Sequence, residues 1–179
     1  MGVLIYIDNF ILTKLFKIRA TKSTDLPLIK QEKRPKKLIF LDVGLVNFKN
    51  KMEKHFLKFN NLASFYRGKI AEQVVGQNLL ASQITKELSL YYWAKKKSEG
   101  SAEVDFCLAK GGRILGIEVK PGHSAKLKSL FSFGREVKNS ILLRVYDGEL
   151  KQEIINRQGR KYKLLSLPFY LVNRILSII

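Results

Sequence analysis

The sequence predicts an α/β domain, and the order of its apolar patterns is the basis for this. A helical pattern spans residues 65–81, strand patterns follow at residues 88–93, 103–109 and 113–119, and a helix and a strand come after them within residues 124–146. Side chains alternate between the faces of a strand but return to one face of a helix every 3.6 residues, so apolar spacing separates the two. The order helix, three strands, helix, strand is typical of an α/β domain.

The first 37 residues are expected to lie outside the main domain. Residues 2–18 carry apolar side chains at intervals of three and four, which fits a helix, but the start of this segment would suit a strand equally well. Residues 19–37 are polar and basic, which predicts a linker or extended arm whose lysines are either solvated or bound to phosphates. We therefore expect an apolar segment and basic linker over residues 1–37 and a domain over residues 38–179.

Two elements open this domain. Residues 38–45 form a short apolar run typical of a strand, and residues 65–81 follow with helical spacing. Glu72 falls on the apolar stripe of that helix, where a carboxylate is costly unless it is paired. Either Glu72 lies at the edge of the stripe and pairs with Arg67 or Lys69, or it projects from a buried helix toward a charged site.

The strongest local pattern is a β-hairpin around Gly111 and Gly112. These glycines separate two alternating runs, and both turn positions can take positive φ. A two-residue loop determines which residues face each other, whereas an odd-length loop would break this register. The expected pairs are Lys110 with Arg113, Phe106 with Ile117, Asp105 with Glu118, Val104 with Val119, and Glu103 with Lys120.

The hairpin is expected to have one apolar face and one charged face. The apolar face comprises Val104, Phe106, Leu108, Leu115, Ile117 and Val119, and the charged face comprises Glu103, Asp105, Glu118 and Lys120. Like charges directly opposite each other destabilise a sheet, so Asp105 facing Glu118 breaks a local rule, as residues at functional sites often do. A Mg²⁺ ion would remove the penalty, because it takes oxygen ligands. Alternatively, Glu103 and Lys120 form an ordinary ion pair while the other two acids point into solvent.

Beyond the hairpin the pattern returns to a helix and a strand. Ser124 to Glu136 has helical apolar spacing, and Asn139 to Tyr146 has the composition of a buried strand. Residues 164–179 are strongly apolar, with Pro168 at the first turn of an expected closing helix.

The charge of the chain points to a polyanionic partner. Lys and Arg outnumber Asp and Glu by 33 to 15, which gives a net charge of +18 and a pI near 10.0. Nucleic acid is the leading candidate, while an anionic membrane and acidic proteins stay open. The lysines expected to contact a phosphate backbone are Lys95, Lys96, Lys97 and Lys126.

Several classes of protein are excluded or disfavoured. The single cysteine, Cys107, cannot form an internal disulfide and is expected to be structural filler in a reducing compartment. One Cys and two His residues cannot build the usual tetrahedral zinc site. No apolar run reaches the roughly 18 residues of a membrane span, and no secretory signal pattern is present, so we expect a cytoplasmic protein without membrane contact.

The order of elements, with Asp105 on one strand and Glu118-Val-Lys120 on the next, resembles the PD-(D/E)XK nuclease superfamily. Further blocks resemble the restriction-endonuclease-like domain of unknown function found C-terminal to AAA-type ATPase modules in prokaryotic ATP-binding proteins. The blocks are Lys37-Leu-Ile-Phe-Leu-Asp-Val-Gly-Leu45, Arg67-Gly-Lys-Ile-Ala-Glu72, Leu90-Tyr-Tyr-Trp93, Glu103-Val-Asp-Phe106, Gly116-Ile-Glu-Val-Lys120 and Leu167-Pro-Phe-Tyr-Leu171. The resemblance implies a restriction-endonuclease-like core of order αβββαβ, with a mixed sheet flanked by helices, from about residue 38 onward.

The resemblance also implies a role for each site residue. Asp105 and Glu118 match the metal-binding acids, Glu72 matches a further acid borne on a helix, Lys120 matches the catalytic lysine, and Glu103 matches an accessory acid. The implied chemistry is hydrolysis of a phosphodiester bond in DNA with Mg²⁺ or Mn²⁺. The ion would polarise the phosphoryl oxygen and lower the pKa of its water, and Lys120 would orient that water or stabilise the developing charge.

Two other functions stay open. Either the domain lacks catalysis and acts as a nucleic-acid-binding or regulatory module of an AAA-type ATPase protein, or it is an unrelated basic α/β domain with a coincidental motif. No G-x-x-x-x-G-K-[ST] phosphate-binding loop occurs in the chain, so no ATP hydrolysis is expected of it. Its opening residues look as though they begin partway through the longer family pattern, so the chain looks like the C-terminal part of such a protein alone. It is a truncated gene product, an isolated domain or a stand-alone relative, and the sequence does not decide among these.

Overall fold

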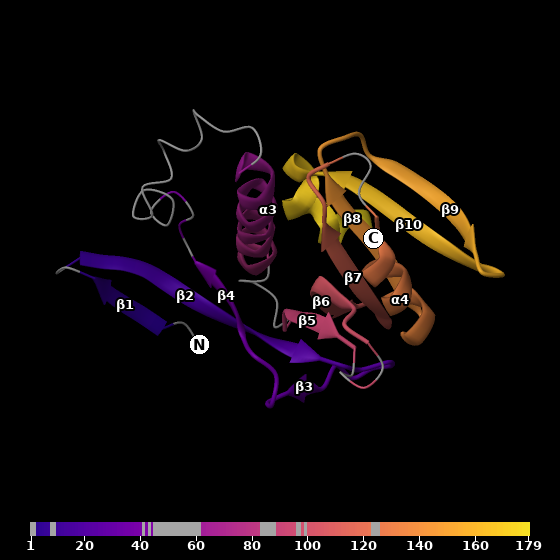
Figure 1. Cartoon of the computed structure of the whole chain (residues 1–179), viewed down its shortest axis with the longest axis horizontal. Helices are drawn as coiled ribbons and strands as arrows, with labels where there is room; N and C mark the ends of the chain where they lie inside the picture. The colour runs from indigo at the N-terminus through magenta and orange to yellow at the C-terminus, as the bar shows by residue number, and fades with distance from the viewer. Residues whose placement is uncertain are drawn as a thin grey trace.

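A mixed β-sheet with helices on both faces forms the body of the molecule (Figure 1). The computed structural model describes residues 3–7, 10–40, 42, 44, 62–82, 89–95, 98, 100–122 and 126–179, and it describes side chains from residue 16 onward except at residues 62–67. The strands are β1 (Val3–Ile7), β2 (Phe10–Thr21), β3 (Lys30–Gln31), β4 (Lys37–Phe40), β5 (Tyr91–Ala94), β6 (Glu103–Lys110), β7 (Arg113–Val119), β8 (Ser140–Tyr146), β9 (Lys151–Arg157) and β10 (Arg160–Pro168). The helices are α3 (Leu62–Ala81), α4 (Lys128–Glu136), the 3₁₀ helix η2 (Phe169–Arg174) and α5 (Ile175–Ile178).

The strands lie in the order β1-β2-β5-β6-β7-β8-β10-β9, with β3 and β4 also paired to β2. Along the chain, the predicted order helix, three strands, helix, strand is confirmed as α3, β5, β6, β7, α4 and β8. The pairs β5–β6 and β6–β7 are antiparallel, whereas β8 runs parallel to β7. A parallel neighbour requires a crossover connection, and α4 lies within that connection.

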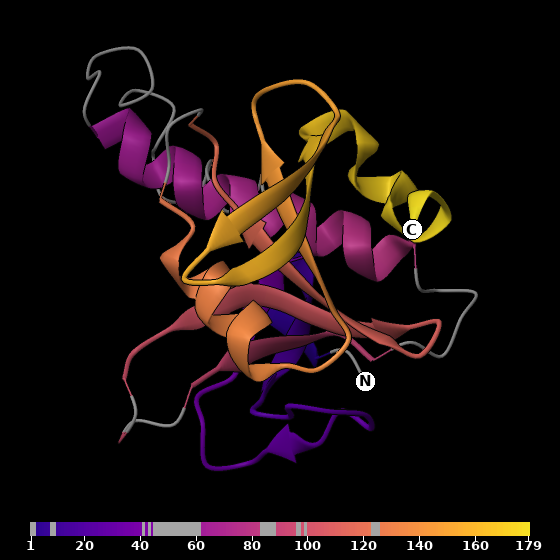
Figure 2. The same ribbon diagram turned by 90° about the vertical axis from the view of Figure 1, so that its right-hand side faces the viewer.

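Helices α3 and α4 pack against opposite faces of the central strands. Val75 and Leu79 of α3 belong to one buried cluster, with Leu115 and Ile117 of β7, whereas Phe133 of α4 belongs to a second cluster. Figure 2 shows α4 in front of the strands and α3 behind them. The central strands are therefore apolar on both faces. Among the described helices, none is long and apolar enough to cross a membrane.

Gly116 on β7 lies against the ring of Phe133, and a Cβ atom there would stand 2.5 Å from Phe133 Cε1. Phe133 is fully buried and packs edge-on against Trp93 at 5.5 Å between ring centroids, so it has little room to move. We expect Gly116→Ala to lower the free energy of unfolding by about 1–3 kcal/mol, measured by urea denaturation. The control is Gly122→Ala, where a Cβ would meet open space, with an expected change within about 0.5 kcal/mol.

The amino-terminal segment, left open between helix and strand, is β-structure. Strand β2 pairs antiparallel with β1 and β4 and parallel with β5. Residues 19–37, expected as a linker or arm, instead contribute the end of β2, all of β3 and the first residue of β4. Residues 22–29 and 32–36 lie outside the strands and are mostly exposed, in line with their polar composition. The division into residues 1–37 and 38–179 stays a prediction.

The expected closing helix over residues 164–179 is correct only in its second half. Residues 160–168 continue as β10, which lies between β8 and β9, and the helical part begins at Phe169. The apolar residues of β10 were misassigned because a buried central strand is nearly continuous in its hydrophobicity. Val172, Ile175 and Leu176 then join the cluster on the α3 side of the sheet.

The hairpin register is confirmed where the two strands pair. Lys110 lies opposite Arg113 and Phe106 opposite Ile117, and Gly111 and Gly112 have φ of 56° and 73°. The described pairing between β6 and β7 ends at Phe106 and Ile117, so the expected backbone pairing of Asp105 with Glu118 is not formed.

A β-bulge in β6 changes which face its first residues occupy. Against β5, Cys107 pairs with Tyr91 but Val104 pairs with Trp93, so β6 has one extra residue there. Val104 and Cys107 both lie in the α4 cluster, whereas Phe106 lies in the α3 cluster. The expectation that Val104 shares a face with Phe106 was therefore wrong. The extra residue brings Asp105 to the α3 side beside Phe106.

Candidate functional site

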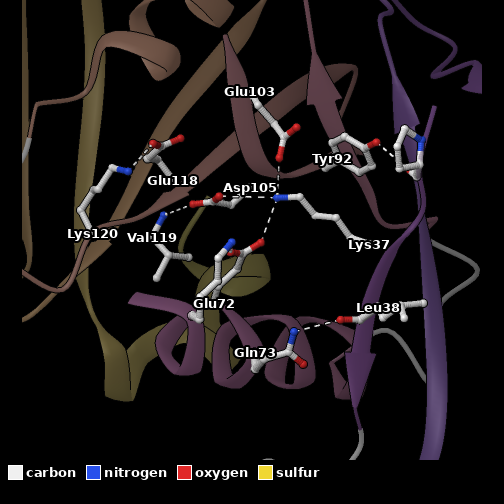
Figure 3. Close-up of polar contacts among 12 residues, drawn as sticks. Lys37, Leu38, Glu72, Gln73, Tyr92, Glu103, Asp105, Glu118, Val119 and Lys120 are labelled. Carbon is white, nitrogen blue, oxygen red and sulfur yellow. Dashed lines mark hydrogen bonds and ion pairs between the residues drawn. The ribbon is translucent and has the colours of Figure 1, made fainter. Parts of the chain in front are cut away.

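Lys37, the first residue of β4, lies at the centre of a cluster of acids (Figure 3). Its Nζ is 2.9 Å from Glu72 Oε1, 3.0 Å from Glu103 Oε1 and 3.6 Å from Asp105 Oδ1. These acids come from α3 and from β6, and Figure 3 shows them approaching the ammonium group from different sides. We call Lys37, Glu72, Glu103 and Asp105 the Lys37 cluster.

Contacts between β4 and α3 determine where Lys37 lies. The side chain of Gln73 accepts a hydrogen bond from Phe40 N and donates one to Leu38 O, and Gln77 donates to Phe40 O. These hydrogen bonds hold α3 alongside β4. Glu72, next to Gln73 on the helix, is thereby held beside Lys37.

Tyr92 of β5 supports the same ammonium group from another side. Lys37 Nζ lies 5.2 Å from the centre of the Tyr92 ring, within the range of a cation–π contact. The Tyr92 hydroxyl donates a hydrogen bond to Pro35 O, which keeps the ring in place. Burial acts to lower the pKa of Lys37, but the charges of Asp105 and Glu72 outweigh it and raise the pKa overall. The Lys37 side chain is therefore protonated and positively charged at neutral pH.

Asp105 lies where β6 and β7 separate. Its Oδ2 accepts a hydrogen bond of 2.8 Å from Val119 N, so the carboxylate takes the place of a backbone partner across the gap. Burial raises the pKa of Asp105, and the charge of Lys37 opposes this shift. One carboxylate thus joins the Lys37 cluster to the middle of the Glu118-Val119-Lys120 motif.

Glu118 and Lys120 form a second pair next to Asp105. Lys120 Nζ lies 2.9 Å from Glu118 Oε1, and Glu118 is only 4% exposed. Burial and the charge of Asp105 raise the pKa of Glu118 to about 7. Burial lowers the pKa of Lys120, but its hydrogen bond with Glu118 and nearby charges raise it overall. The other Glu118 oxygen, Oε2, is buried without a hydrogen-bond partner in the described part of the chain.

The structure brings some of the predicted site residues together and separates others. Glu72 and Asp105 meet at Lys37, whereas in Figure 3 Glu118 points away from α3 and Val119 points toward it. Within the described ranges no group of three or more His, Cys, Asp or Glu residues is arranged to hold a metal ion. The predicted pairing of Glu103 with Lys120 is replaced by Glu103 with Lys37.

The acids of the site match a divalent cation in chemistry but not in arrangement. Carboxylate oxygens are the ligands that Mg²⁺ prefers, and Glu118 Oε2 is a buried carboxylate oxygen without a hydrogen-bond partner among the described residues. However, the Lys37 ammonium occupies the position between Glu72 and Asp105 that an ion would take. With Lys37 there, the described residues do not fit a metal ion.

The lysines predicted to bind nucleic acid differ in their surroundings. Lys95 Nζ lies 2.7 Å from Glu136 Oε1, and its side chain is 15% exposed, so this ammonium already has a partner. Lys126 is exposed. Lys96 and Lys97 lie outside the described residues. Contact of any of these lysines with phosphate stays a prediction.

Sequence reasoning missed Lys37, because it was grouped with the basic residues of the expected linker. The usable indication was its position at the start of an apolar strand-like run, where a lysine with a buried stem can reach a buried acid.

Cys107, expected as filler, is fully buried, and burial raises the pKa of its thiol to about 12. It is therefore an unreactive core residue.

Comparison with known proteins places the chain in a family. No curated protein matches it. Residues 67–170, more than half of the chain, match the family described as "Domain of unknown function (DUF4143)". This domain is commonly found after AAA ATPase modules in prokaryotic proteins. The matched range begins in α3 and ends in η2, so it includes the whole helix, three-strand, helix, strand unit except the start of α3. The chain belongs to the DUF4143 family.

Proposed function

We propose that this chain is a nuclease-like domain of the PD-(D/E)XK type that hydrolyses phosphodiester bonds of DNA with Mg²⁺ or Mn²⁺. One observation carries the proposal: Asp105 Oδ2 accepts a hydrogen bond from Val119 N, the middle residue of Glu118-Val119-Lys120. The acid and the acid-x-lysine motif thereby meet where two neighbouring strands part. The order α3, β5, β6, β7, α4, β8 is the order expected for that superfamily's core.

The side chains have distinct parts in this proposal. Bound metal would supply Lewis acidity and an activated water. Lys120 is about one third exposed, so its ammonium can reach a phosphate group as well as Glu118. A compact point charge at this position stabilises negative charge that develops on a phosphoryl oxygen. Asp105, bonded to Val119 N, holds the start of β6 against the end of β7.

Plasmid cleavage in Mg²⁺ or Mn²⁺ tests the proposal. We expect the wild-type chain to nick or linearise plasmid, and we expect Asp105→Asn and Lys120→Met each to lower the rate by about 100-fold or more, the scale of losing a charge-stabilising group. Lys128→Met, which removes an exposed lysine at the start of α4, is the matched control and should cleave at the wild-type rate. Absence of cleavage, or cleavage that survives both site variants, would refute the assignment.

A second candidate is a catalytically silent nucleic-acid-binding or regulatory domain of an AAA-type ATPase protein. The observation favouring it is the Lys37 ammonium, which forms ion pairs with two of the acids that a metal would need, Glu72 and Asp105. Such a domain should bind DNA in EDTA with an affinity that falls steeply as salt rises, because the chain carries a net charge of +18. DNA binding without cleavage, in the presence of Mn²⁺, would select this candidate.

A further inference from the structure

We propose that the two-stranded ribbon formed by β9 and β10 binds duplex DNA through its outer end, residues 157–163. The register places this end beside the start of β8, whereas Glu118 and Lys120 lie at the end of β7. The docking surface is therefore separate from the candidate site. The inference goes beyond the proposed function, because it concerns where DNA binds and holds whether or not the chain cleaves it.

The first support is the charge of the ribbon. Residues 151–163 contain five basic residues and one acid, Glu153, whose carboxylate lies 2.8 Å from Lys151 Nζ. The other four basic residues, which we call the ribbon cations, are exposed and form no ion pair within the described part of the chain: Arg157, Arg160, Lys161 and Lys163. Arg157 even pairs across the strands with Arg160, although like charges directly opposite each other destabilise a sheet. An anionic partner would remove this cost.

The second support is a cavity beside the same end of the ribbon. It has a volume of about 370 Å³ and lies between β10, the end of α4 and the start of β8. The charged residues that line it are Arg160, Lys161 and Lys163, and no acid is among its lining residues. Clefts lined by one sign of charge concentrate ions of the opposite sign. This lining therefore favours a phosphate group.

The third support is the shape of the ribbon. Figure 1 shows it reaching the outer edge of the molecule beyond α4. Arg157 lies over the Phe131 ring of α4, so it is on the α4 face of the ribbon. Alternation places Arg160 on that face too, and Lys161 and Lys163 on the other. The major groove of DNA, about 12 Å wide, admits a two-stranded ribbon, and cations on both faces can meet the phosphates of both groove walls.

The side chains between the ribbon cations favour DNA over an acidic protein. Gln152, Asn156 and Gln158 are exposed amides, and such amides can bind adenine in the major groove as arginine binds guanine. The core of a protein interface is instead apolar and depleted of charge. Within residues 151–163 the one large exposed hydrophobic side chain is Ile154. Duplex RNA is disfavoured, because its major groove is too deep and narrow for side chains to read.

Fluorescence anisotropy of a labelled DNA duplex, titrated with the full chain in EDTA at several salt concentrations, tests the inference. The ribbon variant combines Arg157→Gln, Arg160→Gln, Lys161→Gln and Lys163→Gln. Its affinity should fall at least about tenfold, and the slope of log K against log salt should fall by about 3–4, because each phosphate contact contributes about 0.9.

The matched control removes the same charge from four exposed lysines around β2 and β3. It combines Lys17→Gln, Lys22→Gln, Lys33→Gln and Lys36→Gln, and its slope should stay within about 1 of the wild-type value. An equal loss of slope in the control would mean that net charge, and not the ribbon, determines binding, and would overturn the inference.

A smaller variant keeps the test valid should the ribbon variant fold poorly. Arg157 and Arg160 contact α4 through the Phe131 ring and the Arg135 carbonyl oxygen, whereas Lys161 and Lys163 form no hydrogen bond or ion pair in the described chain. Lys161→Gln with Lys163→Gln should keep the wild-type melting temperature and lower the slope by about 2. An unchanged slope in this variant would overturn the inference.

Competition identifies the partner. Unlabelled DNA duplex should displace the labelled duplex at a lower concentration than polyglutamate or duplex RNA of equal total charge does. Equal displacement by polyglutamate or by duplex RNA would overturn the assignment to duplex DNA.

The two proposals fail in different ways. DNA binding that depends on the ribbon cations, with no cleavage in Mg²⁺ or Mn²⁺, would uphold the inference and end the nuclease assignment. Cleavage by the wild type, with affinity and salt slope unchanged in both ribbon variants, would uphold the nuclease and end the inference.

Discussion

Replacing Lys37 with methionine is expected to lower the free energy of unfolding by about 3–5 kcal/mol at pH 8 in metal-free buffer. Removing one partner of a buried ion pair leaves the other charge without compensation, and losses of about this size result. Asp105, less than one fifth exposed, would keep only its hydrogen bond from Val119 N, whereas Glu72 would keep Lys69 at 3.4 Å from its other oxygen. At pH 5 the loss should be smaller, because burial raises the pKa of Asp105 and an acid that has taken up a proton needs no cation.

Urea denaturation of wild type and variant at the two pH values measures this effect. Lys36→Met is the matched control, since Lys36 is exposed, and its expected change is within about 0.5 kcal/mol. A loss below about 1 kcal/mol for Lys37→Met would show that the cluster does not depend on this ammonium. An equal loss at both pH values would show that protonation of Asp105 does not replace it.

Glu118→Gln is expected to stabilise the protein at pH 8 and to flatten the dependence of its stability on pH. The pKa of Glu118 is raised from 4.5 to about 7, so the folded chain binds this proton more tightly than the unfolded chain does. The stability linked to the proton is fully present below about pH 4.5 and is lost as the pH rises to about 7. Each pKa unit corresponds to about 1.4 kcal/mol, so the loss is on the order of 3 kcal/mol at most. Glutamine carries no charge, so the variant does not lose this stability as the pH rises.

Denaturation between pH 4.5 and 8, in EDTA, provides the measurement. Wild-type stability should fall across this interval, and the fall should be smaller in Glu118→Gln. Glu149→Gln, at an exposed position, is the control and should keep the wild-type dependence. A Glu118 variant that loses stability at pH 8, with an unchanged slope, would mean that the contact with Lys120 outweighs the cost of burying the charge.

Local patterns were enough to predict the centre of the fold. Gly111 and Gly112 predicted the hairpin turn and its register, because only a few backbone conformations join two strands so tightly. Apolar spacing predicted α3, α4 and β8, because the period of a helix or strand is visible within one element. The acid on β6 and the Glu118-x-Lys120 motif on β7 were thus predicted to lie on adjacent strands, as they do.

Only the tertiary structure shows what those acids face. The contact between Lys37 and Glu72 joins residues 35 positions apart, and no periodic pattern records such a pairing. The bulge in β6 depends on the fit of β6 against β5, so strict alternation placed Val104 on the wrong face. Strands β3 and β9 become visible only through their partners, because an edge strand that faces solvent resembles a polar loop in sequence. Periodicity and turn chemistry act within about 20 residues, whereas the cation in this acid site is supplied by a strand that reaches it through folding.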